Sequence, residues 1–278
     1  MPRLYMGLRR SSRECISQIL ADTPQIPEGC QWGTFLRNHD ELTLEMVTEE
    51  ERRYMWEEYA PESRWRCNLG IRRRLSPLVD NDDAKIRLLN AMLLSLPGSP
   101  VLYYGDEIGM GDDPWLPDRD GVRTPMQWDD SETAGFSTAL PEDFHLPVIH
   151  TFGHDPEHVN VARQMDDPSS LLVWTRAMLG IRRHHPVFGT GEFTDLGGAD
   201  MAVMSFLRHN EHETILCLAN LSDTERTVTL HLPQFAGVTG SSLIHGQDAH
   251  PVKSDGTLSV PLWPYGYRWL QMSGEEKS

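Results

Sequence analysis

The sequence predicts an α/β fold followed by a smaller antiparallel β-domain. Two short apolar segments, Trp32–Leu36 and Val101–Tyr104, each end in a polar cluster, and a strongly apolar helical stretch separates them. After Pro186 the apolar spacing changes from about 3.6 residues to about 2. The strand–helix–strand order predicts parallel strands with active-site residues at their carboxyl ends, as in (β/α)8 barrels, and the later period predicts antiparallel strands.

The elements of the first part follow from apolar spacing and from the prolines that end them. Four helices are expected, over residues 1–22, 43–59, 82–96 and 169–184. The stretch from Gly109 to about Asp167 is rich in Gly, Pro and Asp and is expected to be a long loop, of the kind that is usually functional. Only two strands are found before Pro186, and two strands cannot close a barrel.

The second part alternates apolar and polar residues between turn signals. The expected strand segments are 201–207, 214–221, 227–232, 243, 258–260 and 267–272. We therefore expect three parts along the chain. Residues 1–186 would be the C-terminal portion of a barrel domain, 187–272 an antiparallel β-domain and 273–278 a solvated tail.

Composition limits the partners that the chain can have. Asp and Glu total 41 against 25 Lys and Arg, a formal charge of −16, so nucleic acid and anionic membranes are not expected partners. The basic run Arg72–Arg74 is expected to be a solvated surface. The start shows no signal-peptide pattern, no apolar run approaches the ~20 residues that span a bilayer, and the four cysteines form no CxxC pair. These observations favour a cytoplasmic protein with free thiols.

The sharpest candidate site is the cluster Phe35–Glu41, which contains Asn38, His39 and Asp40 at the end of a predicted strand. A carboxylate beside an imidazole suits sugar recognition, because both groups hydrogen-bond to hydroxyls and such bonds can strengthen as oxocarbenium character develops. The triplet alone is also typical of a helix N-cap beside a loop histidine. Both interpretations stay open on these residues alone.

Three clusters taken together resemble a known family. Asn38–Thr48, Pro97–Met110 and Arg123–Trp128, followed by Ala134–Ser137, resemble in order and spacing the α-amylase superfamily of retaining glycoside hydrolases. Within it they look most like its trehalose-synthase (maltose α-D-glucosyltransferase) branch. The resemblance implies that the chain contains about strands 7 and 8 of a (β/α)8 TIM barrel with their flanking helices, followed by a small antiparallel β-sandwich.

The resemblance also implies roles for individual residues. Asp40 matches the family's transition-state stabiliser and His39 a ligand of the reacting sugar. Glu41 and Glu45 match acidic residues at the entrance of the trehalose-synthase site, and Arg123 lies in a loop that contributes to the sugar pocket. No metal ligand is expected in this chain, because the family's calcium site belongs to a part of the fold that these residues do not match.

Two essential groups of the family have no match here. The nucleophile Asp and the general acid Glu each lie in a motif that does not occur in these 278 residues. Retaining chemistry needs two carboxyl groups about 5–5.5 Å apart across the scissile bond. Asp106 and Glu107 are adjacent in a predicted extended segment and should point to opposite faces, so they are expected to structure a loop instead.

The resemblance therefore implies the C-terminal portion of an enzyme that isomerises maltose to trehalose, with some release of glucose, by retaining intramolecular glucosyl transfer. The isolated chain is expected to be inactive. Two alternatives stay open: a non-catalytic carbohydrate-binding or regulatory remnant, and one half of a split α-glucosidase-type hydrolase. Expected partners are these sugars and either an N-terminal barrel half or a second copy of the chain.

Overall fold

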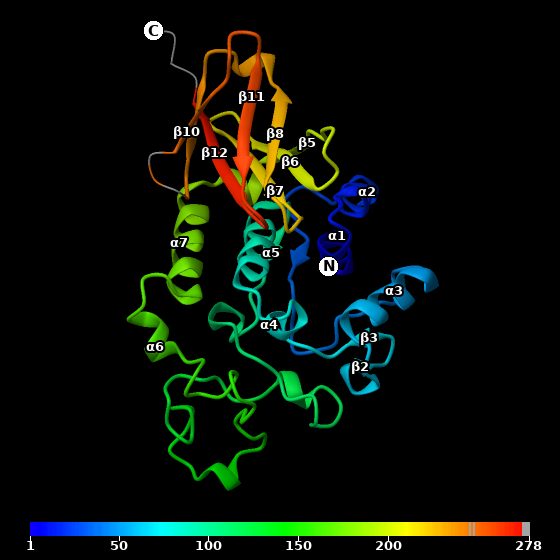
Figure 1. Ribbon diagram of the computed structural model, residues 1–278, viewed down its shortest axis with the longest axis vertical. Coiled ribbons are helices and arrows are strands. Elements are labelled where there is room, and N and C mark those ends of the chain that lie inside the picture. Colours follow the sequence, from blue (N-terminus) through cyan, green and yellow to red (C-terminus); the bar gives the residue numbers. More distant parts are fainter. Residues whose placement is uncertain (245, 247, 274–278) are drawn as a thin grey trace. The chain divides into compact units, whose positions relative to one another are not determined.

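A computed structural model describes residues 1–244, 246 and 248–273 (Figure 1). The helices are α1 (Pro2–Arg10), α2 (Glu14–Asp22), α3 (Glu49–Tyr59), α4 (Leu75–Leu78), α5 (Asp83–Ser95), α6 (Val161–Met165), α7 (Leu171–His184) and α8 (Val187–Thr190). Short 3-10 turns are η1 (Ser63–Trp65), η2 (Asp106–Ile108), η3 (Asp120–Val122), η4 (Pro141–Asp143) and η5 (Pro233–Phe235). Of the predicted tail, only Ser273 is described, and it ends a strand.

Two of the four predicted helices match α5 and α7, and the other two need correction. The single helix predicted for residues 1–22 is broken at Ser11, which has a left-handed φ of 46°. The helix predicted from residue 43 begins only at Glu49, because the Thr48 side chain accepts a hydrogen bond from the Glu51 N–H and the Glu51 carboxylate accepts one from the Thr48 N–H. This capping box defines where the helix starts.

The strands of the α/β part are shorter than predicted. They are β1 (Gly33–Thr34), β2 (Arg66–Cys67), β3 (Gly70–Ile71) and β4 (Ser99–Pro100). β1 and β4 pair in parallel, since the Ser99 N–H donates to the Trp32 carbonyl and the Val101 N–H to the Thr34 carbonyl. The strand predicted over 101–104 is therefore wrong, because β4 lies just before it and ends at Pro100. The expected loop over 109–167 has no strand and contains η3, η4 and α6.

The β-domain contains β5 (Glu192–Asp195), β6 (Val203–His209), β7 (Thr214–Asn220), β8 (Arg226–His231), β9 (Thr239–Ser242), β10 (Ala249–Pro251), β11 (Thr257–Leu262) and β12 (Tyr267–Ser273). Six strands form one sheet in the order β10-β9-β12-β7-β6-β5, and β8 pairs with β11 in a second sheet. All of these pairs are antiparallel, as predicted. The sequence missed β5, β9 and β10, and Leu243 directly follows β9 instead of forming a strand.

The core of the β-domain is aliphatic and lies between the two sheets, which makes it a sandwich. Side chains from β8 and β11 meet side chains from β6, β7 and β12 there: Val203, Leu207, Leu216, Leu218, Val228, Leu230, Leu232, Val252, Leu258, Val260, Leu262, Leu270 and Met272. Along β8 and β11 buried and exposed residues alternate, whereas β6 and β7 are buried on both faces. The fold class predicted from the sequence is thus confirmed.

By packing, the structure divides into two compact units that are interleaved along the chain. One unit comprises residues 1–2, 34–87 and 100–177, and the other comprises residues 3–33, 88–99 and 178–278. The division of the chain at residue 186 stays a prediction. Over the residues described, no helix combines the length and the apolar character needed to cross a bilayer.

Candidate functional site

Asp40 lies in the turn that follows β1. The Asn38 Oδ1 accepts a hydrogen bond from the Asp40 N–H at 2.9 Å, which fixes the turn through a local side-chain contact. The Asp40 carboxylate forms an ion pair with the Nε of Arg119, and its Oδ1 lies 4.0 Å from Nη2 of Arg123. Its side chain keeps 42% of its exposure. A carboxylate that is held in place and still accessible can accept hydrogen bonds from a ligand.

Arg119 connects two neighbouring carboxylates. Its Nε lies 2.9 Å from Glu41 Oε2 in addition to its contact with Asp40, and its Nη1 lies 2.9 Å from the Asp118 carboxylate. The hydrogen bond to Glu41 and the surrounding carboxylates raise the pKa of Arg119. The sequence did not predict a role for Arg119, because Asp40 and Glu41 lie almost eighty positions away and no local pattern marks it.

Glu41 is more deeply enclosed than Asp40. Its Oε1 accepts a hydrogen bond from the Asn68 amide at 2.8 Å. Burial by itself would raise the pKa of Glu41, but hydrogen bonds from Asn68, from the backbone, from Asp40 and from Arg119 outweigh burial and lower the pKa to about 2. Glu41 is therefore an ionised anchor for Arg119 at neutral pH and is not a proton donor.

Backbone carbonyls complete the site. The Arg123 Nε donates to the His39 carbonyl at 2.8 Å, while the His39 side chain is exposed. Arg37 is buried and donates to the Asp40 carbonyl at 2.7 Å and to the Arg73 carbonyl at 2.6 Å. The Asp40 turn is thus held by one arginine through its backbone and by two through its carboxylate.

The run Arg72–Arg74 is not the solvated surface that the sequence suggested. Arg72 donates to four carbonyls, those of Arg64, Leu116, Asp118 and Pro114, at 2.5–3.1 Å. Arg73 pairs with the Asp112 carboxylate at 3.0 Å. Arg74 is fully buried and donates to the Val122 and Tyr104 carbonyls. The expectation failed because most of these partners are backbone carbonyls, and the one carboxylate, that of Asp112, is distant in sequence, so none of them shows in a local charge pattern.

Gly121 sets the distance between two arms of the loop that carries Arg119 and Arg123. Its carbonyl accepts a hydrogen bond from the Asp113 N–H at 3.0 Å. A Cβ at this position would lie 1.9 Å from the Asp113 carbonyl oxygen, a distance that no side chain can occupy. The two arms therefore touch through backbone atoms alone.

Glu45 and Asp106 are not part of the Arg119 cluster, which is the group formed by Asp40, Glu41, Arg119 and Arg123. Glu45 is exposed, and its backbone N–H bonds to the Thr43 hydroxyl at 3.4 Å. Across the described residues, no ion pair joins its carboxylate to Arg119 or Arg123. Asp106 begins η2 and is buried, and this burial raises its pKa to about 6 despite Arg74 and Arg37 nearby. A buried Asp106 fits the expected structural role, and the catalytic and binding roles of the predicted site residues stay predictions.

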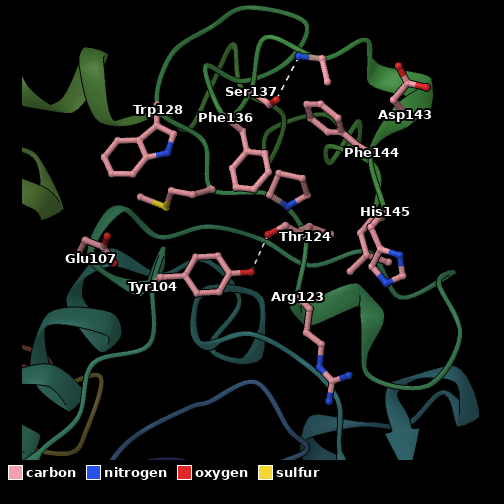
Figure 2. A pocket seen from close by; sticks show the side chains of 14 residues that line it. Tyr104, Glu107, Arg123, Thr124, Trp128, Phe136, Ser137, Asp143, Phe144 and His145 are labelled. Atoms are coloured by element: carbon pink, nitrogen blue, oxygen red, sulfur yellow. Dashed lines mark hydrogen bonds between the residues drawn. The ribbon is translucent and has the colours of Figure 1, made fainter.

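Arg123 also lines a pocket of about 720 Å3. Figure 2 shows the rings of Trp128, Phe136 and Phe144 on one side and the Tyr104 ring on the other. Glu107, Asp143 and His145 also line it. Sequence reasoning quoted Trp128 and Phe136 only as parts of a motif. No group of three or more His, Cys, Asp or Glu among the described residues is arranged to hold a metal ion.

Two parts of the chain match known family models. Residues 54–191 match the family model described as "Alpha amylase, catalytic domain", and residues 196–269 match "Maltogenic Amylase, C-terminal domain". The chain is thus similar to the α-amylase family over both of its parts. The order of the two matches confirms the prediction of a C-terminal barrel portion followed by a β-domain.

Relatives named trehalose synthase match almost the whole chain. A "Trehalose synthase" from Pimelobacter sp. (strain R48) is 52% identical over 277 residues, which is 98% of this chain and 48% of that protein. A "Trehalose synthase/amylase TreS" from Mycobacterium tuberculosis is 50% identical over 99% of this chain and 46% of that protein. The chain thus spans about half the length of these relatives. The predicted resemblance to the trehalose-synthase branch is confirmed.

Several solved structures share the fold. An α-amylase from H. orenii aligns with a TM-score of 0.68 over 98% of this chain and 47% of its own, at 19% identity. The trehalulose synthase MutB from Pseudomonas mesoacidophila aligns with a TM-score of 0.65 over 94% of this chain and 46% of its own, at 24% identity. At these identities the likeness concerns the fold alone.

Proposed function

We propose that this chain supplies the transition-state-stabilising wall of a glucose-binding site in an enzyme that interconverts maltose and trehalose. The observation that carries the proposal is the Asp40 turn, held by Arg119 and Arg123 in a chain about half identical to trehalose synthases over almost its whole length. No cofactor is proposed for these residues. A cytoplasmic reaction fits the four free cysteines.

The roles proposed for the residues follow from their contacts. The accessible Asp40 carboxylate accepts hydrogen bonds from hydroxyls of the reacting sugar, and these strengthen as positive charge develops on the ring. Arg119 and Arg123 keep that carboxylate in place. The exposed His39 imidazole binds a neighbouring hydroxyl, and the exposed Glu45 carboxylate acts at the entrance of the site.

The reaction itself needs groups beyond this wall. A carboxylate nucleophile takes the glucosyl group with release of glucose, a carboxylic acid protonates the leaving oxygen, and the anomeric hydroxyl of the same glucose then attacks to give the α,α-1,1 bond. Neither family motif for these two groups occurs in the 278 residues. The chain alone should therefore produce neither trehalose nor glucose from maltose.

Complementation tests this function. The chain is mixed with a polypeptide that carries the nucleophile and acid motifs of the Pimelobacter relative, and trehalose formed from maltose is measured by chromatography. We expect trehalose only in the mixture, and Asp40→Asn should lower its rate by at least about 100-fold. Asp130→Asn, a change at an exposed residue, is the matched control and should leave the rate unchanged.

Three outcomes would contradict the proposal. Turnover by the chain alone would show that it holds its own nucleophile and acid. Glucose without trehalose in the mixture would favour the split hydrolase. Full activity of the Asp40→Asn mixture would remove Asp40 from the reaction and favour a non-catalytic sugar-binding module.

A further inference from the structure

Two carboxylates line the pocket of about 720 Å3 without a cationic partner. They belong to Glu107, which is half-buried, and to Asp143, which is exposed; Figure 2 shows them at its left and at its upper right. Within the part of the chain that the structure describes, neither carboxylate forms an ion pair or accepts a hydrogen bond. Negative charge that no protein group neutralises attracts a positively charged ligand.

Arg123 does not neutralise these carboxylates, although it lines the same pocket. Its guanidinium is turned away from the rings in Figure 2, its Nε donates to the His39 carbonyl at 2.8 Å, and its Nη1 lies 3.8 Å from the Asp120 carboxylate. His145 also lines the pocket, but it is exposed, and solvent screens any charge on its ring. The pocket therefore disfavours phosphates and other anions.

Aromatic rings form much of the pocket wall. Trp128 keeps 50% of its exposure and Phe136 keeps 52%. The Phe136 and Phe144 rings meet edge to face with centroids 5.7 Å apart. The face of an aromatic ring is negative and attracts a cation, and Arg74 already lies over the Tyr104 ring at 4.9 Å. Among the described residues, no Arg or Lys lies over the other three rings, so their exposed faces remain for a ligand.

The rings are held by a fixed backbone. The Trp128 N–H donates to the Ala134 carbonyl at 2.8 Å, and Ala134 and Gly135 have left-handed φ angles of 53° and 62°. On the other side of the pocket, the Tyr104 hydroxyl donates to the Thr124 carbonyl at 2.7 Å. The pocket volume lies within the range of about 300–1,000 Å3 that is typical of small-molecule sites. A preformed wall of this kind binds a ligand without a large ordering cost.

Rings and unpaired carboxylates together favour one class of ligand. A primary ammonium group needs hydrogen-bond acceptors for three N–H donors, whereas a quaternary ammonium group has no donor and spreads its charge over methyl groups that pack on rings. We propose that the pocket binds a small organic cation with a quaternary, methylated ammonium group, its methyl groups against Trp128 and Phe136 and its charge balanced by Glu107. This site is independent of the sugar chemistry proposed for Asp40 and takes a ligand of a different class.

Calorimetric titration of the 278-residue chain with choline at low ionic strength tests the proposal. We expect saturable binding that Trp128→Ala weakens by about tenfold, the size of effect that follows the loss of one ring from a cation–π site. Trp128→Phe keeps a ring and should retain most of the affinity, which separates the loss of the ring from misfolding. Glu107→Gln removes a charge and keeps the shape, and it should weaken binding by about threefold or more. Added salt should also weaken binding, because it screens the carboxylates.

Matched controls separate charge and ring contacts from unspecific binding. The alcohol 3,3-dimethylbutan-1-ol has the shape of choline without its charge and should bind at least about tenfold more weakly. Trp32→Ala and Glu132→Gln change exposed residues that do not line the pocket, and both variants should bind choline as the unmodified chain does.

Three outcomes would overturn the inference. They are the absence of saturable choline binding, equal affinity for choline and its neutral analogue, and equal affinity in the Trp128→Ala and unmodified chains. Because the titration uses no sugar and measures no turnover, failure of the trehalose assay leaves this result untouched, and failure here leaves the Asp40 prediction standing.

Discussion

The β-domain and the loop at residues 101–125 hold their backbones in different ways. In the β-domain, strands such as β7 and β12 pair their N–H and C=O groups in continuous ladders above an aliphatic core. In the loop, which has no strand, carbonyls from Tyr104 to Val122 accept hydrogen bonds from Arg72 and Arg74. The sandwich has many equivalent contacts, whereas the geometry of the loop depends on a few side chains.

This difference explains how the side chains of the candidate site are held in position. A ladder fixes a regular surface but cannot aim single side chains from an irregular loop. A buried guanidinium has five N–H donors in a rigid fork and can fix several carbonyls at once. Arg119 and Arg123 lie in the loop that is fixed in this way, so changes at arginines that touch no ligand should still alter the site.

The largest effect is expected in the sandwich. Leu218→Ala removes a core side chain of β7 and should lower the free energy of unfolding by about 3–4 kcal/mol, because it leaves a cavity that the sheets cannot close. Urea unfolding measures this, with Leu218→Met as the volume-matched control. A loss below 1 kcal/mol would mean that the sandwich core contributes less than its burial indicates.

The second-largest expected effect is a pH dependence of stability that arises in the loop and not in the β-domain. Asp106 lies in the loop, is buried, and has a pKa raised from 3.8 to about 6. Since the folded state then binds more protons than the unfolded state, the free energy of unfolding should fall as pH rises from about 4 to about 6. Asp106→Asn should remove about 2–3 kcal/mol of this fall.

Chemical unfolding at several pH values measures the change at Asp106. The exposed Asp255, in the β-domain, provides the control variant Asp255→Asn, which should keep the fall. A profile unchanged by Asp106→Asn would show that its carboxyl titrates normally in the folded chain.

A smaller effect tests the arginine contacts directly. Arg72→Lys keeps the charge but loses the fork that bonds the Leu116, Asp118 and Pro114 carbonyls, at a cost of about 1–2 kcal/mol. Hydrogen exchange should accelerate at the Val122 and Arg123 N–H groups and stay unchanged in β7. Arg53→Lys, at an exposed position, is the control. Equal acceleration in both regions would contradict the separation between them.

The smallest effect concerns Glu41. Its pKa of about 2 means that its stabilising contribution is present above its usual value of 4.5 and is lost as pH falls from there towards 2. Glu41→Gln should flatten this loss and cost no more than about 1 kcal/mol at pH 7. Acid unfolding followed by circular dichroism measures it, and Glu45→Gln should keep the unmodified profile. If Glu45→Gln instead removed the acid dependence of unfolding, Glu41 would not be the ionised anchor.

The sequence predicted the parts of the molecule whose contacts are local. The helix at 83–95 and the alternating strands β8 and β11 show their burial in their own apolar spacing. The apolar run that contains Tyr103 and Tyr104 has the sequence pattern of a strand. In the structure their hydroxyls donate to the Val122 and Thr124 carbonyls across the loop, and no strand pairs with their backbone. The cluster around Asp40 was marked by a carboxylate beside an imidazole, and the family resemblance supplied the roles expected of its residues.

The rest of the site could not be predicted, because its contacts join distant segments through irregular backbone. Arg119 meets Asp40 only after the loop has folded, and Arg72 was interpreted as surface because its carbonyl partners carry no sequence signal. The aromatic pocket brings Tyr104 together with Trp128 and Phe144 from three separate stretches. Hydrophobic periodicity predicts neither hydrogen bonds from a guanidinium to distant carbonyls nor aromatic rings that turns bring together.

Gly121 gives this architecture a further consequence. A library that samples every amino acid at each position of the loop should find position 121 among the least tolerant, because even alanine would force Asp113 and its arm outward. Such a map, taken alone, would mark Gly121 as a sugar contact. Its intolerance would in fact result from the close approach of the main chain at Gly121 to the main chain at Asp113.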